Sequence, residues 1–110
     1  MLNVNLQKNS DNEVSVRVEG ELVIGPEAHQ FRETLDVLIG KYLRTVVDLA
    51  GISKIDSTGV GVLVQAYAAA QDRGNCLRVV NVTGQVREVL LLVKLLTVFD
   101  GDTGETGLAA

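Results

Sequence analysis

Hydrophobic and polar positions change their spacing along the chain, and these changes predict where strands and helices lie. Apolar residues alternate with polar ones at residues 3–6 and again at residues 14–18. Alternation with a period of two is typical of half-buried strands, and the polar segment NSDN between the two runs supplies a hairpin turn. Residues 21–24 predict a short third strand, which ends at Gly25 and Pro26.

After Pro26 the apolar spacing becomes three or four residues, which indicates helices. Pro26 suits the first turn of the first helix, and Gly40 is a suitable end. The buried face of this helix is expected to consist of Ala28, Phe31, Leu35, Leu38 and Tyr42. The same spacing predicts a second helix that buries Val60, Leu63, Val64, Tyr67 and Ala70. A third helix, capped by Thr83, is expected to bury Val86, Val89, Leu90 and Val93.

Short runs rich in β-branched residues separate the helices. Residues 45–49 (TVVDL) fit a strand that is covered on both faces by helices. Residues 76–81 (CLRVVN) and 95–99 (LLTVF) predict two further strands. The order of elements predicts an α/β fold, a single domain in which a mixed sheet of about five strands packs against three to four helices. Residues 1–100 are expected to form this domain, and residues 101–110 a flexible C-terminal tail.

Length and composition restrict the class of protein. A chain of 110 residues matches one compact domain, and its formal net charge of −4 argues against a nucleic-acid partner. Cys76 is the single cysteine, so no disulfide framework is expected. The N-terminus lacks the basic and then apolar pattern of a signal peptide, and no apolar run has the length of a membrane span. We therefore expect a cytoplasmic protein that does not insert into membranes.

The start of the second predicted helix carries the candidate chemistry. Asp56, Ser57 and Thr58 are residue types that cap helices, because their side-chain oxygens accept the unpaired amides of the first turn. Gly59 and Gly61 each cost the helix roughly 0.5–1 kcal/mol relative to alanine. Two such unfavourable residues near one helix start indicate that another backbone segment or a partner approaches the helix closely there. A helix N-terminus also accommodates anions, so a phosphoryl group on Ser57 would be tolerated there.

No enzyme motif fits these residues. A Walker-type loop requires a lysine, and none follows Gly59 or Gly61. A hydrolase elbow requires G-x-S-x-G, but Ile55 occupies the first glycine position. The only histidine, His29, is expected on the solvated side of the first helix, and histidines and cysteines form no metal-binding cluster. The sequence therefore predicts a protein that is not an enzyme and binds no metal or cofactor.

The segment VVDLAGISKIDSTGVGVLVQAYAAAQDRG closely resembles the core motif of the STAS domain family, in particular its anti-sigma factor antagonists. In that family a strand ending in D-L precedes a variable loop, the motif D-S-[ST]-G-[LV]-G and a helix. The opening V-x-V-x-G-E-L and the later LRVVNVTGQVREVLLLVKLLTVFD also match, so the resemblance covers nearly the whole chain. It implies a STAS-like fold.

The resemblance further implies a phosphorylation switch. In the family, an anti-sigma factor that is also a serine kinase phosphorylates the serine after the aspartate, which is Ser57 here. The unphosphorylated antagonist binds the anti-sigma factor and so frees a sigma factor, whereas the phosphorylated form does not bind. A phosphatase would reset Ser57. Thr58 is a possible minor acceptor, and Asp56 would shape the loop and supply a fixed negative charge.

Partner contact is expected from two segments. One precedes the first predicted helix and contains Glu21, Leu22 and Val23; the other runs into the second predicted helix and contains Lys54, Asp56, Ser57, Thr58, Gly59 and Gly61. Val23 stands where the best-known antagonists carry an aspartate that supports the kinase contact. This departure leaves open a different partner, or a contact made through Glu21 instead. A scaffold or transport-accessory STAS domain without a phosphorylation cycle is therefore the alternative function, and a small-ligand-binding domain is a third.

Overall fold

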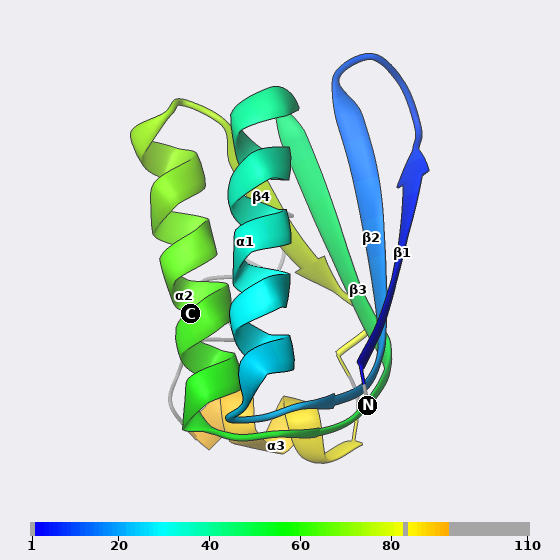
Figure 1. Ribbon diagram of the computed structural model, residues 1–110, viewed down its shortest axis with the longest axis vertical. Coiled ribbons are helices and arrows are strands. Elements are labelled where there is room, and N and C mark those ends of the chain that lie inside the picture. The colour runs from blue at the N-terminus through cyan, green and yellow to red at the C-terminus, as the bar shows by residue number, and fades with distance from the viewer. Residues whose placement is uncertain (1, 83, 93–110) are drawn as a thin grey trace.

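The computed structural model describes residues 2–82 and 84–92 (Figure 1). Strands and helices alternate after an initial pair of strands, as the hydrophobic pattern predicts. In chain order the elements are β1 (Leu2–Lys8), β2 (Glu13–Leu22), α1 (Pro26–Lys41), β3 (Arg44–Ile55), α2 (Ser57–Asp72), β4 (Cys76–Val80) and α3 (Gly84–Leu92). The α/β class predicted from the sequence is confirmed.

The described strands form one sheet in the order β1-β2-β3-β4. β1 pairs antiparallel with β2, whereas β2 with β3 and β3 with β4 pair in parallel. A parallel connection needs a crossover, and α1 and α2 supply the two crossovers. Both helices lie side by side on the same face of the sheet, and α3 lies across the end of the sheet where β3 finishes (Figure 1). The first turns of α1 and α2 consequently lie at one end of the molecule.

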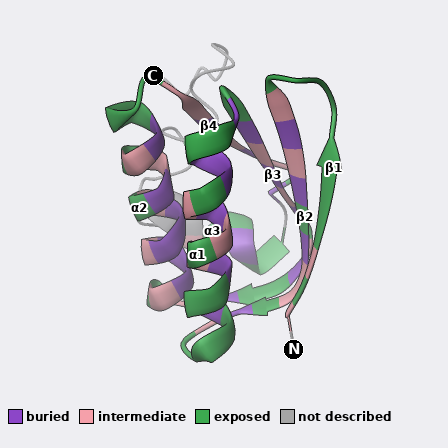
Figure 2. Ribbon diagram, turned by 45° about the horizontal axis from the view of Figure 1, so that its top comes forward, coloured by how far each residue is buried: buried purple, intermediate pink, exposed green. Residues whose placement is uncertain are grey.

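The hydrophobic core lies between the sheet and the helix pair (Figure 2). Every position predicted for the inner face of α1 is buried, from Ala28 to Tyr42. In α2, Val60, Leu63 and Ala70 are buried, and the remaining predicted positions are partly buried against the same core. Burying one large aliphatic side chain contributes about 1.5–3 kcal/mol, so this single layer of contacts holds both helices on the sheet.

Two strand predictions were wrong in detail. Val47 and Leu49 are buried under the helices, but Val46 and Asp48 lie half-buried on the other side of β3. Among the described elements, helices therefore cover one face of the sheet and not both. Residues 21–24 form no separate strand, because β2 continues to Leu22 without interruption.

Several predictions fall outside the described residues. These are the cap at Thr83, the buried position Val93 of the third helix, the strand at residues 95–99 and the tail at residues 101–110. The described sheet has four strands where about five were expected. Within residues 2–82 and 84–92, no helix has both the length and the apolar character that a membrane span requires.

Candidate functional site

Asp56 organises the end of the molecule where α2 begins. It is the N-cap residue, and its carboxylate accepts a hydrogen bond from the backbone N–H of Gly59 at 3.0 Å. The other carboxylate oxygen accepts the backbone N–H of Ile24 at 2.9 Å. One side chain thus joins the first turn of α2 to the loop that leads into α1. Capping by an aspartate contributes about 0.5–2 kcal/mol relative to alanine.

These hydrogen bonds also hold the charge of Asp56. The N–H of Ile24, followed by those of Gly59 and Thr58, lowers the pKa of the carboxyl group below its usual 3.8, although partial burial acts in the opposite direction. Amide donors favour the ionised form of a carboxyl group, and the positive end of the α2 dipole acts in the same sense. A fixed negative charge therefore lies next to Ser57 at neutral pH.

Ser57 is the first residue of α2 and is exposed. Its hydroxyl makes no hydrogen bond within the part of the chain that the structure describes. The capping role that its residue type allows is filled by Asp56 instead. Ser57 consequently does not cap this helix, and the residue is exposed to solvent.

Gly59 and Gly61 have different surroundings although only one residue separates them. A Cβ atom on Gly59 would collide with the carbonyl oxygen of Leu22 and approach the Cγ1 atom of Ile55 to 2.7 Å. A Cβ atom on Gly61 would have nothing within 4 Å. The close approach expected for both glycines is therefore made by this chain's own β2 at Gly59, and only Gly61 leaves open space for another molecule.

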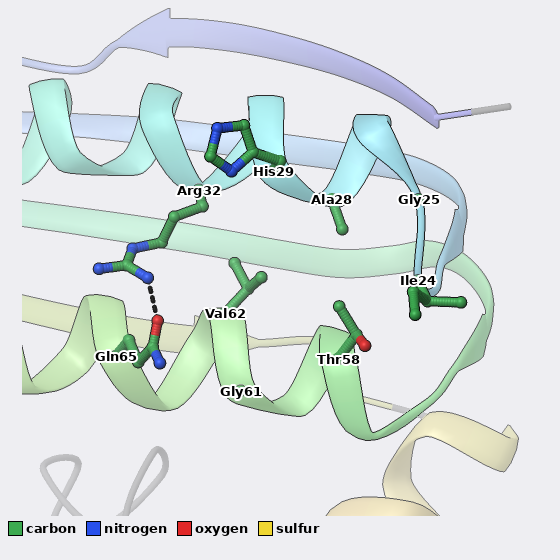
Figure 3. A pocket seen from close by; sticks show the side chains of 9 residues that line it. All are labelled: Ile24, Gly25, Ala28, His29, Arg32, Thr58, Gly61, Val62 and Gln65. Carbon is green, nitrogen blue, oxygen red and sulfur yellow. Dashed lines mark hydrogen bonds between the residues drawn. The ribbon is translucent and has the colours of Figure 1, made fainter.

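A groove lies between the N-terminal halves of α1 and α2 (Figure 3). It has a volume of about 360 Å³ and is lined mainly by Ala28, His29 and Arg32 of α1 and by Thr58, Gly61 and Gln65 of α2. Arg32 donates a hydrogen bond to Gln65 across the groove and forms an ion pair with Asp36 at 3.4 Å. Thr58 is half-buried and lines the groove, whereas Ser57 is not among the lining residues.

Ile24 lines the end of the groove and is a residue that the sequence reasoning missed. Its side chain is 76% exposed, the highest value among the exposed large hydrophobic residues of the described chain. The hydrogen bond from its N–H to Asp56 fixes its backbone beside the start of α2. Hydrophobicity alone predicted a strand residue here, but its position just before Gly25 and Pro26 was a signal that the strand was ending.

The other predicted partner-binding residues divide into accessible and inaccessible ones. Glu21 and Lys54 are exposed and lie opposite each other in the register of β2 and β3. Val23 follows β2 and is half-buried. The side chain of Leu22 is fully buried and Gly59 is buried as well, so both lie inside this chain's own packing, and their contact with a partner stays a prediction.

The solvent side of α2 is uncharged. Between Asp56 and Asp72 the helix has no acidic or basic side chain, whereas α1, of equal length, carries five charged residues as well as His29. Charged residues are depleted at the centre of protein–protein interfaces. His29 is exposed beside Glu33 at 3.3 Å, and within the described residues no three His, Cys, Asp or Glu side chains are grouped to hold a metal ion.

The α/β fold with its parallel crossovers agrees with the STAS-like fold that the sequence resemblance predicted. Residues 5–99 match the family model described as "Mlab, STAS domain". The chain belongs to the STAS domain family, as its sequence motifs predicted. No curated protein sequence matches it.

Solved structures share the fold. A Thermotoga maritima protein assigned as an anti-sigma factor antagonist is 26% identical, with a TM-score of 0.74 over 84% of this chain and 79% of that chain. SpoIIAA of Bacillus in its phosphorylated form is 20% identical, with a TM-score of 0.72 over 88% of this chain and 87% of that chain. A sulfate transporter family protein from Wolinella succinogenes is 13% identical, with a TM-score of 0.62 over 77% of this chain and 69% of that chain.

Proposed function

We propose that this protein is an anti-sigma factor antagonist that binds an anti-sigma factor when Ser57 is unphosphorylated and releases it when Ser57 carries a phosphate. The anti-sigma factor would be the serine kinase, and a phosphatase would restore the binding form. The role requires no catalytic group of the protein's own, and it places the protein in the cytoplasm with the transcription machinery.

One observation carries this proposal: Ser57 is exposed at the first position of α2 while Asp56 caps the helix. A kinase can reach the hydroxyl, and modification removes no hydrogen bond from the fold. The amides of the first turn and the helix dipole tolerate an anion at this position. A solved relative, SpoIIAA, is known in a phosphorylated form, which supports the same reaction here.

The surface around Ser57 suits a protein partner. It combines the exposed side chain of Ile24, the groove between the helices, the open space beside Gly61 and the uncharged outer side of α2. A phosphate on Ser57 adds about −1.5 to −2 charges next to the ionised Asp56. A partner that buries this surface would have to desolvate that charge, so binding would weaken without a change of fold.

The test is phosphorylation by a candidate anti-sigma kinase in the presence of ATP, followed by intact-mass measurement. The wild-type chain should gain one phosphate, and fragment spectra should place it on Ser57. Ser57→Ala should remain unmodified yet bind the partner, and the matched control Ser53→Ala, which changes another exposed serine, should be modified as wild type. Phosphate found only on Thr58 or Ser53 would refute the assignment.

A second candidate function is a scaffold or transport-accessory domain that binds its partner without phosphorylation. The likeness to a sulfate transporter family protein and the presence of Val23 instead of the aspartate of the best-known antagonists favour it. The same surface around Ser57 would bind the partner in such a role. Under this function, Ser57→Asp would weaken binding, but no kinase partner would modify the wild-type chain.

A further inference from the structure

The sheet ends at β1 in an edge that lacks the usual protection against pairing. Its sequence, LNVNLQK, has no proline, no acidic residue and a single lysine at its last position. Its register with β2 is continuous, whereas the register of β2 with β3 is shifted twice. Proteins generally protect edge strands by shortness, proline, charges or bulges. β4, at the opposite end of the described sheet, is only five residues long and has Arg78 at its centre.

The edge of β1 also has an unpartnered hydrophobic side. Leu2, Val4 and Leu6 point to the helix side of the sheet because side chains alternate along a strand. Leu2 and Val4 pack partly against the core, but Leu6 is 52% exposed. Next to them, a groove of about 190 Å³ lies between β1 and α1, with Leu2, Val4 and Phe31 among its lining residues. In Figure 1, no described element lies beyond β1.

We propose that two copies of this protein form a symmetric dimer by antiparallel pairing of their β1 strands. The pairing that uses all seven residues of β1 is centred on Asn5. It places Leu6 of each copy opposite Val4 of the other, beside the groove that Val4 lines. Asn3 then faces Gln7 across the open side of the sheet. A two-fold axis makes each contact occur twice, as an isologous interface requires.

Charge complementarity selects a second copy as the occupant. In this register Lys8 of one copy lies opposite Leu2 of the other. The N–H of Leu2 donates to the Glu27 carboxylate at 3.0 Å, so Glu27 lies at that end of β1. Lys8 pairs with Asp11 at 3.4 Å in one chain, and both side chains are largely exposed. The exposed Lys8 ammonium thus comes to the end of the partner's β1 at which Glu27 lies, and the opposite charges of these two groups attract each other.

Sedimentation velocity of the full chain over a wide concentration range tests the proposal. The wild-type chain should shift from monomer to dimer as its concentration rises. Leu6→Glu should raise the dissociation constant of the dimer at least tenfold, because it places a carboxylate opposite Val4 and near Glu27. Val37→Glu is the matched control: Val37 is 67% exposed on α1, and this variant should dimerise as wild type. Circular dichroism would verify that both variants fold.

A charge exchange tests the register. Lys8→Glu should weaken the dimer, and combining it with Glu27→Lys should restore at least half of the lost free energy. A wild-type chain that stays monomeric throughout the range would overturn the proposal. So would a dimer that Leu6→Glu leaves intact, or one that the double variant fails to restore. These outcomes are independent of phosphorylation at Ser57, which lies at the start of α2 and not on β1.

Discussion

The two sides of the first turn of α2 carry opposite kinds of residue. On the side that faces the sheet, Gly59 is in contact with Leu22 and Ile55, and any added atom collides. On the side that faces solvent, Ser57 is exposed, and a Cβ atom added to Gly61 would have nothing within 4 Å. Successive helical residues point in different directions, so one short motif serves both sides. The motif therefore combines a structural part, Asp56 and Gly59, with an accessible part, Ser57 and Gly61.

The largest effect is expected from Gly59→Ala. Its Cβ atom has no room between β2 and the end of β3, and overpacking of this kind typically costs about 1–3 kcal/mol. The higher helix propensity of alanine offsets at most about 1 kcal/mol of that loss. Thermal or urea unfolding should show clear destabilisation. Unchanged stability would mean that Leu22 and Ile55 move apart easily, and that the two sides of the turn differ less than the contacts indicate.

Asp56→Ala should have the next largest effect. It removes the cap and leaves the N–H groups of Ile24 and Gly59 without their acceptor, at a cost of about 0.5–2 kcal/mol. Because the folded pKa of Asp56 is depressed, its contribution is present above the unfolded pKa and is lost as pH falls through the folded pKa. Stability of wild type should therefore approach that of the variant in acid, at pH values below the usual 3.8 of this group.

The control for Asp56 is Asp72→Ala, which removes an exposed carboxylate at the other end of the same helix. It should leave the free energy of unfolding within about 0.5 kcal/mol of wild type, as surface substitutions usually do. The difference in free energy of unfolding between wild type and Asp56→Ala should shrink in acid. A difference that persists unchanged at low pH would contradict the assignment of that stability to the ionised carboxylate.

Ser57→Asp tests the accessible side through binding. It adds one negative charge where a phosphate adds nearly two, so it should mimic part of the switch. Affinity for the proposed anti-sigma factor partner should fall at least tenfold, about 1.4 kcal/mol, while the free energy of unfolding stays near that of wild type. Titration calorimetry measures the affinity, urea unfolding measures the free energy of unfolding, and amide spectra report on the conformation. Chemical-shift changes throughout the sheet would indicate a change of conformation, in contradiction to a local switch.

The elements of the fold were predictable because burial imposes a period on the sequence. The inner faces of α1 and α2 follow this rule. The environment of Val46 could not be predicted in this way. A β-branched residue indicates a strand, but it does not indicate whether a helix covers that face of the strand. Ile24 was missed for a related reason: hydrophobicity predicts burial, and an exposed isoleucine departs from the average.

The different roles of Gly59 and Gly61 could not be predicted from the sequence either. Each has the same cost in a helix, and both were expected to leave room for close approach. The distinction depends on the Leu22 carbonyl oxygen, which reaches Gly59 only after β2 and β3 have paired. A contact between segments far apart in the chain leaves no local pattern, so the inaccessible half of the motif could be identified only in three dimensions.

Gly61→Ala should have the smallest effect on stability, and the opposite sign to Gly59→Ala. Alanine is the better helix former by up to about 1 kcal/mol, and its Cβ atom has nothing within 4 Å, so the chain should become slightly more stable. The added methyl group narrows the groove beside Thr58, so a partner that enters the groove should bind more weakly. Ala68→Gly is a useful contrast, because Ala68 is exposed on α2 outside the groove. It should lower stability and leave affinity unchanged. If Gly61→Ala is more stable than wild type and binds the partner with undiminished affinity, the partner does not approach this turn. The space beside Gly61 would then not serve partner binding.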